Sequence, residues 1–145
     1  MRWMWMAASL LVAAPALAAV PDPTFSIVDD VIALNPSGSC AFHVTVFNQF
    51  DAPINHSHVD VDFGTCPVSL SATQAPGFTV SGAVISGFTD PSGAVVFHIR
   101  GTGAGACTVR VIADGVIVGV LGQVNTCAST PARQTSWGRL RNIYH

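Results

Sequence analysis

Short apolar segments broken by turn residues dominate the chain from residue 20 onward. Each segment is rich in Val, Ile, Thr and Phe, and each ends near Gly, Pro, Asn or Asp. This pattern is typical of many short strands and therefore of an antiparallel sandwich or barrel. The predicted strands cover residues 25–34, 41–47, 59–63, 68–73, 78–86, 94–100, 107–113 and 116–124.

Two of these segments alternate between apolar and polar residues. In residues 41–47, we expect Phe42 and Val44 to face a core while His43 faces solvent. In residues 94–100, the odd-numbered positions take the core face in the same way. Such alternation predicts sheets that are buried on one face only.

Turn residues separate the predicted strands at regular places. The sequence "TDPSG" at residues 89–93 fits a type I turn, and "ADGV" at residues 113–116 is a strong hairpin signal. The run "RGTGAGAC" at residues 100–107 could instead cradle a phosphate. However, the "CTVRVIA" that follows it has no helical period, and a phosphate-binding loop should open a helix. We therefore expect an inter-strand corner.

The first nineteen residues have the organisation of a secretory signal peptide. Arg2 precedes an apolar stretch, and small residues around Ala16–Ala18 form a cleavage site. Because no cysteine lies at that site, we do not expect a lipid-anchored protein. The predicted organisation is a signal peptide at residues 1–19, one domain at residues 20–127 and a C-terminal tail at residues 128–145.

Four cysteines remain after the signal peptide, and an even number in an exported chain predicts two disulfides. Their spacing contains no C-x-x-C, which argues against a zinc ribbon or a thioredoxin-like site. Three pairings are open from the sequence. If strands alternate in direction, all four cysteines meet at one pole, and this arrangement favours Cys66 with Cys107 and Cys40 with Cys127.

The charge of the chain excludes one class of partner. Residues 20–145 contain no Lys and no Glu, and eight aspartates face five arginines. Binding to nucleic acid depends on a basic surface, so we expect no nucleic-acid partner.

The sequences "VTVFNQFDAPINHSHVDVDF", "TDPSGAVVFHIRG" and "CTVRVIADGVIVG" resemble, in order and spacing, the immunoglobulin-like domains of bacterial secreted and surface proteins of the invasin and intimin type. The match covers about residues 24–125. The resemblance implies an immunoglobulin-like β-sandwich of about seven to eight antiparallel strands. Domains of this family serve as stalks, spacers or adhesive modules, so a binding or structural role is implied. The chain departs from the family at Asp51–Ile54, where a Gly-Asn-Pro-Val turn is usual.

Histidines and aspartates are the residues that could give this chain a metal-binding or catalytic role instead of a binding or structural one. His56, His58 and Asp60 could line one strand face as metal ligands, but a solvated face is the preferred interpretation, and no metal or other cofactor is predicted. The chain has no G-x-S-x-G motif and, beyond the signal peptide, no Glu for H-E-x-x-H. We therefore predict no enzymatic activity.

The last strand and the tail are the least conventional segments. The "VIVGVLGQV" segment is apolar on both faces, so it must be covered or become an edge open to self-association. The tail favours a short helix, and its basic and aromatic residues suggest a lid, a sorting signal or a membrane-surface helix. We expect no stable membrane insertion, because one or two turns bury little apolar area. The tail residues concerned are Trp137, Arg139, Leu140, Arg141 and Tyr144.

These observations predict a secreted, periplasmic or cell-surface protein that acts as a non-catalytic binding or structural module of the adhesion or matrix type. Its partner would be a protein or a glycan that the sequence does not identify. The alternative is a small secreted metal-binding protein or enzyme that uses the surface histidines.

Overall fold

Eleven strands and no α-helix make up the part of the chain that the structure describes. The computed structural model describes residues 19–128, so most of the predicted signal peptide and the predicted helix of the tail lie outside the described residues. The strands are β1 (Ile27–Val28), β2 (Ile32–Leu34), β3 (Ala41–Thr45), β4 (His58–Asp62), β5 (Val68–Leu70), β6 (Thr79–Ser81), β7 (Val84–Phe88), β8 (Ala94–His98), β9 (Gly101–Gly103), β10 (Gly105–Ala113) and β11 (Val116–Thr126).

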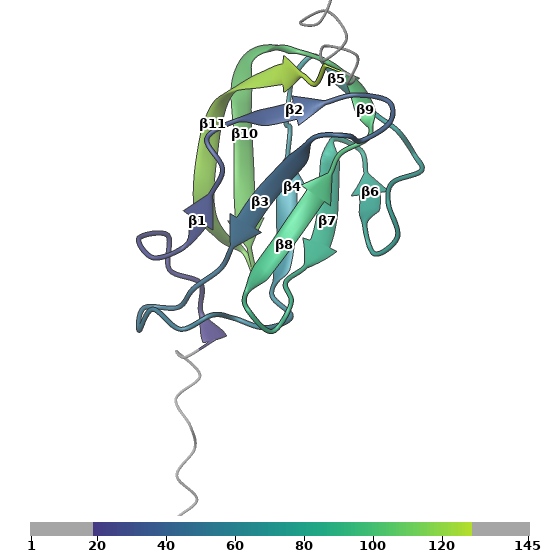
Figure 1. Ribbon diagram of the computed structural model, residues 1–145. Coiled ribbons are helices and arrows are strands. Elements are labelled where there is room, and N and C mark those ends of the chain that lie inside the picture. The colour runs from purple at the N-terminus through teal and green to yellow at the C-terminus, as the bar shows by residue number, and fades with distance from the viewer. Residues whose placement is uncertain (1–18, 129–145) are drawn as a thin grey trace, which may run out of the picture.

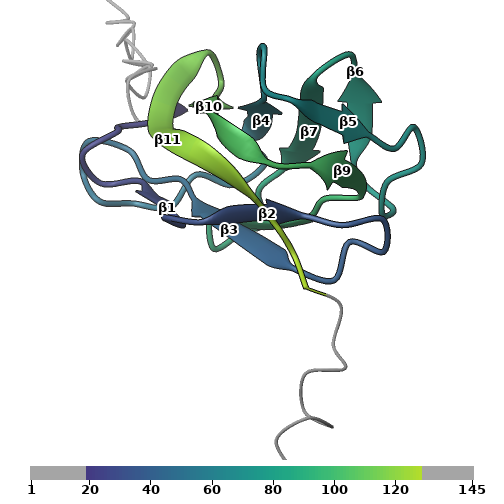
Figure 2. The same ribbon diagram turned by 90° about the horizontal axis from the view of Figure 1, so that it is seen from above.

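The strands form two facing layers (Figures 1 and 2). One sheet has the order β1-β3-β8, and the other has the order β2-β11-β10-β4-β7-β6; β5 and β9 form a small two-stranded sheet. All pairs are antiparallel except β2 with β11, which is parallel. The all-β prediction is confirmed, but the strands are more numerous than predicted and the larger sheet is mixed.

The core lies between the two layers. Phe42 on β3 pairs in register with Phe97 on β8, and both side chains are fully buried. Val61 on β4 and Val111 on β10 are buried in the same cluster from the opposite sheet. Burying a side chain of this size stabilises the fold by roughly 1.5–3 kcal/mol relative to leaving it exposed. His43 stays exposed, which confirms the alternation predicted for residues 41–47.

The predicted strand at residues 25–34 is in fact two strands in different sheets. β1 pairs with β3, whereas β2 pairs with β11. At the break, the Asp29 amide donates to the His43 carbonyl oxygen, and the Asp29 carboxylate accepts hydrogen bonds from the His43 amide. The carboxylate thus ends the β1 ladder, and the chain crosses to the other layer over residues 29–31.

Two further segments differ from the prediction. Residues 78–86 form a β6–β7 hairpin rather than one strand, because Gly82 takes a φ of +59° and reverses the chain. The glycine run predicted as a corner forms β9, which pairs with β5 before β10 begins. At Gly103, whose φ is +110°, a Cβ atom would collide with the Pro67 carbonyl oxygen. As expected, the run is followed by a strand and not by a helix.

The two predicted turns form as their sequences indicate. Gly93 has a positive φ, and its amide donates to the Asp90 carbonyl oxygen to close the first turn. The Ser92 hydroxyl and the Ala94 amide donate to the Asp90 carboxylate and hold the pKa of that group below its ordinary value. Asp114 and Gly115 both have positive φ, as a two-residue hairpin requires.

Two disulfides join Cys40 to Cys127 and Cys66 to Cys107, the pairing that the topology favours. The Cα–Cα distances are 6.0 Å and 5.3 Å. β3 begins and β11 ends at this pole, and β4 ends and β10 begins there (Figure 1). The bridges therefore close one end of both layers, and such bridges are typical of an oxidising, extracytoplasmic compartment.

Removing the Cys40–Cys127 bridge should destabilise the protein strongly. The bridge spans 87 residues, so the chain-entropy account predicts that a Cys40→Ala/Cys127→Ala double variant loses about 4.6 kcal/mol of unfolding free energy. The Cys66→Ala/Cys107→Ala variant should lose a similar amount, because the entropy depends only weakly on loop length. Urea unfolding of the three proteins measures both losses. A variant that unfolds at the wild-type urea concentration would refute this role for its bridge.

Candidate binding surfaces

The predicted metal candidates lie at the end of the larger sheet where β4 begins. His58 is the first residue of β4, but His56 precedes the strand in a turn with a φ of +57°. Both rings contact Phe88 on β7: His56 stacks on it at 4.5 Å between ring centroids, and His58 meets it edge-on at 5.1 Å. The two histidines therefore lie close together because both contact Phe88. They do not line one face of a single strand, as the metal-binding alternative assumed.

Asp60 is the third predicted metal candidate. The Ser86 hydroxyl donates to its carboxylate, and the other carboxylate oxygen is 3.6 Å from Nδ1 of His58. Within residues 19–128, no cluster of three or more His, Cys, Asp or Glu side chains is arranged to hold a metal ion.

The hairpin between β10 and β11 holds this histidine segment in place. The Ser57 hydroxyl and the His58 amide both donate to the Asp114 carboxylate, at 2.7 Å and 2.9 Å. The Ser57 amide donates to the Thr89 hydroxyl, which in turn donates to the Ile54 carbonyl oxygen. Charge-assisted bonds of this kind are among the stronger hydrogen bonds in proteins. The backbone that carries both rings is therefore held by the side chains of Asp114 and Thr89.

The outer face of the larger sheet presents apolar side chains to solvent. Phe88 is 50% exposed, Ile117 is 48% exposed and Val120 is 62% exposed. The register places Val120, Arg110 and Asp62 in one row across β11, β10 and β4. An outer face that combines a half-exposed aromatic ring, aliphatic groups and isolated charges is suited to binding a partner.

A polar hollow lies on the same outer face, near the Cys66–Cys107 bridge. It has a volume of about 330 Å³ and is lined by residues from the end of β4 and the start of β10. The carboxylate of Asp62 accepts a hydrogen bond from the Gly64 amide, which shapes one wall. The lining residues are Asp62, Gly64, Thr65, Thr108 and Arg110.

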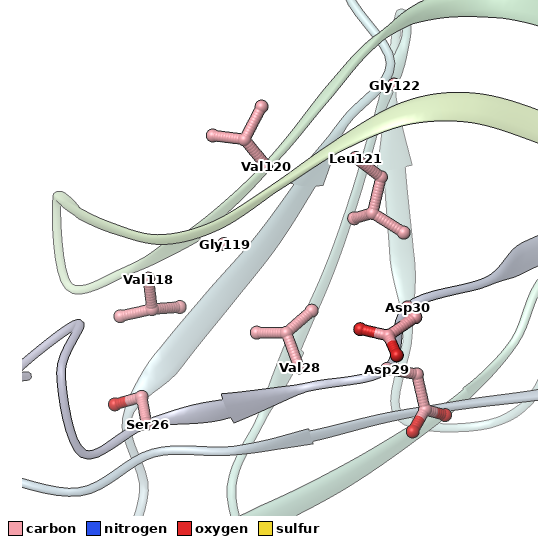
Figure 3. A pocket seen from close by; sticks show the side chains of 9 residues that line it. All are labelled: Ser26, Val28, Asp29, Asp30, Val118, Gly119, Val120, Leu121 and Gly122. Carbon is pink, nitrogen blue, oxygen red and sulfur yellow. The ribbon is translucent and has the colours of Figure 1, made fainter.

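A second hollow opens at the edge of the larger sheet, where the chain crosses between layers. This edge cavity has a volume of about 360 Å³ and lies between residues 26–30 and residues 118–122 of β11. Figure 3 shows Val28 and Leu121 on its facing sides, with the Asp30 carboxylate pointing toward Val28. At its floor, Val28 packs so closely on Gly119 that a Cβ atom there would lie 2.8 Å from the Val28 side chain.

The edge cavity exists because β2 covers only part of β11. β2 pairs with Val124–Thr126, and β10 pairs with β11 on its other side. Within the described chain, no strand pairs with the outer edge of β11 along residues 116–123. The self-association predicted for the last strand is not tested by this geometry, but the structure does leave an edge where a strand could add.

The predicted tail residues Trp137, Arg139, Leu140, Arg141 and Tyr144 lie outside the described residues. By contrast, the sequence did not reveal Phe88 or the edge cavity as parts of a site. Two signals could have identified them: Phe88 directly precedes a turn, and the adjacent Asp29 and Asp30 interrupt an apolar segment. Consecutive aspartates are unfavourable inside a strand and indicate a break.

Comparison with known proteins finds no family model, no curated protein and no solved structure that matches this chain.

Residues 19–128 include no helix with the length and apolar character needed to cross a membrane.

Zinc or copper should leave the thermal stability of the protein unchanged, because within residues 19–128 His56 and His58 do not belong to a cluster of three or more side chains arranged to hold a metal ion. A site that bound either ion at hundredfold excess over its Kd would add about 2.7 kcal/mol to the unfolding free energy. Thermal unfolding with and without each ion measures this difference. A higher Tm that His56→Ala abolishes and His98→Ala preserves would overturn the prediction.

Proposed function

We propose that this protein is an exported, non-catalytic binding or structural module of the adhesion or matrix type, placed at the bacterial cell surface or in the extracellular space. The observation that carries the proposal is the outer face of the larger sheet. It exposes Phe88, Ile117 and Val120 on a body that two disulfides lock. A rigid β-sheet face with exposed aromatic and aliphatic groups is a common way to present a binding surface.

An immunoglobulin-like sandwich is the finer fold that we propose. In that fold, the first, second and fifth strands share one sheet, while the third, sixth and seventh share the other. The orders β1-β3-β8 and β11-β10-β4 are consistent with this division. The crossing of the first strand to pair in parallel with the last is also compatible with it. This topology supports the resemblance to invasin-type and intimin-type domains.

The proposed location outside the cytoplasm rests on two independent features. The sequence begins with a predicted signal peptide at residues 1–19, and both predicted disulfides form in the folded body. Thiols in the cytoplasm are normally kept reduced, so a body with two long-range bridges is suited to a secreted, periplasmic or surface environment.

A protein or a glycan is the partner class that fits the exposed surface. The ring of Phe88 is flanked by His56 and His58, so three flat rings gather at one end of the sheet. Such rings can stack on apolar side chains or on the apolar faces of sugars. Residues 20–127 contain eight aspartates and two arginines, a balance that disfavours nucleic acid.

Substituting Phe88 should weaken partner binding, whereas substituting another exposed phenylalanine should not. Phe50 is the matched control, because it is 67% exposed and lies in the loop between β3 and β4, outside the strands of the larger sheet. We expect Phe88→Ala to reduce binding at least roughly tenfold, the scale of an interface hot spot. Phe50→Ala should bind as the wild type does.

The binding assay uses arrays of glycans and of extracellular matrix proteins, together with immobilised copies of this protein. The array components that bind the wild type are ranked by their affinity in titrations. The wild type, Phe88→Ala and Phe50→Ala are then compared on the component that binds most tightly. Absence of binding on every surface, or equal binding by Phe88→Ala and the wild type, would reject the proposed face.

A further inference from the structure

We propose that the C-terminal tail of the same chain docks as an added strand on the open edge of β11, beside Asp30, in place of the short helix that its sequence favours by itself. The open edge is defined here as residues 118–122, the part of β11 that borders the edge cavity. The tail would continue the larger sheet where β2 stops. This inference concerns a different surface from Phe88 and is independent of the proposed external partner.

The open edge has the geometry that strand addition requires. Gly119, Val120 and Leu121 pair in register with β10 on one side, so their backbone is already extended, and Val118 and Gly122 lie at irregularities of that ladder. β2 adds to the same outer edge two residues further along, in a parallel pairing with Val124–Thr126. A strand edge with free backbone donors and acceptors readily accepts another strand. Natural proteins usually cover such edges, and a segment that does so is expected here.

Charge favours the tail as the occupant. The tail, residues 128–145, contains three arginines and no acidic residue, whereas residues 20–127 contain eight aspartates against two arginines. Two of those aspartates, Asp29 and Asp30, line the edge cavity. One oxygen of the Asp29 carboxylate bonds to the backbone and ring of His43. Asp30 is exposed, and its carboxylate points into the cavity region, so it is available to an arginine (Figure 3).

The tail is long enough to reach the open edge. Cys127 is anchored to Cys40 by a disulfide, and Val120 lies seven residues earlier on β11, about 23 Å away at 3.3 Å per residue. The residues beyond Ala128 can span about 56 Å when extended. The tail must first reverse direction and run past β2. After these residues are used, residues 136–141 are the first that can lie beside the open edge.

Those residues carry suitable side chains. In an extended segment, Trp137, Arg139 and Arg141 fall on one face, and Leu140 falls on the other. The arginines can pair with Asp30, while the apolar groups can cover Val28, which lines the edge cavity. Because the tail is tethered, its effective concentration at the edge is in the millimolar range, which favours its own edge over that of a second copy.

Amide hydrogen exchange along β11 tests the docking directly. The exported full-length protein is compared with a variant that ends at Ala128, and with Arg139→Ser/Arg141→Ser in the full-length chain. We expect outward-facing amides of residues 118–122 to exchange roughly tenfold faster in both variants, because the added strand no longer protects them. Circular dichroism confirms that each protein is folded. If the shortened variant does not fold, the double arginine variant still decides the question.

A charge-matched pair tests the role of Asp30. Asp30→Asn should speed exchange at residues 118–122, whereas Asp51→Asn should not, since Asp51 does not line the edge cavity and lies in a turn whose φ of +57° an asparagine tolerates. High salt should reproduce the Asp30→Asn effect by screening the pair.

Two results would overturn the proposal. One is equal exchange at residues 118–122 in the full-length protein and both tail variants. The other is protection that increases with protein concentration, together with a dimer mass in analytical ultracentrifugation, because a second copy would then occupy the open edge.

Discussion

The crossing of the first strand between the two sheets is the constraint on which the other features depend. β1 begins on the three-stranded sheet, and Asp29 ends its ladder by bonding to His43. The chain then reaches the larger sheet as β2, which covers only Val124–Thr126 of the last strand. This one local break therefore joins the two layers through the backbone, creates the edge cavity and leaves the rest of the β11 edge open.

The two poles of the body are secured by different chemistry. At one pole, two disulfides tie the ends of β3, β4, β10 and β11 together. At the other, the Asp114 carboxylate and the Thr89 hydroxyl bind the backbone of the segment that carries His56 and His58. The chain has few charged side chains, so neither pole relies on a network of ion pairs. The ring cluster around Phe88 is consequently held on a frame that is fixed at both poles.

Much of this fold can be predicted from the sequence because its signals are local. Alternation places Phe42 and Phe97 in the core, and the Asp-Gly pair at residues 114–115 identifies a hairpin. The disulfide pairing follows from strand direction once the strands are known. The break at Asp29 is harder to predict, because it depends on contacts with His43, fourteen residues away. The β6–β7 hairpin was missed because Gly82 lies within a segment that is otherwise typical of a strand.

The candidate surfaces are less accessible to sequence reasoning than the fold. Phe88 meets His56 and His58 only because β7 pairs with β4, a neighbour that the strand pattern alone does not specify. The edge cavity likewise arises because β2 pairs only with Val124–Thr126 of β11. The absence of a neighbouring strand along the rest of β11 has no sequence pattern that would predict it. Charge was the most informative signal, since the acidic body and the basic tail are visible from composition alone.

The central claim is that the β body is closed at one pole by two defined disulfide bridges, as the proposed export of the protein would require. Peptide mapping of the protein recovered from its native envelope, alkylated without reduction, tests this claim most directly. We predict a mature N-terminus after residue 19, no alkylated cysteine, and cross-linked peptides that join Cys40 to Cys127 and Cys66 to Cys107. Free thiols, or peptides joined in another pairing, would contradict the account.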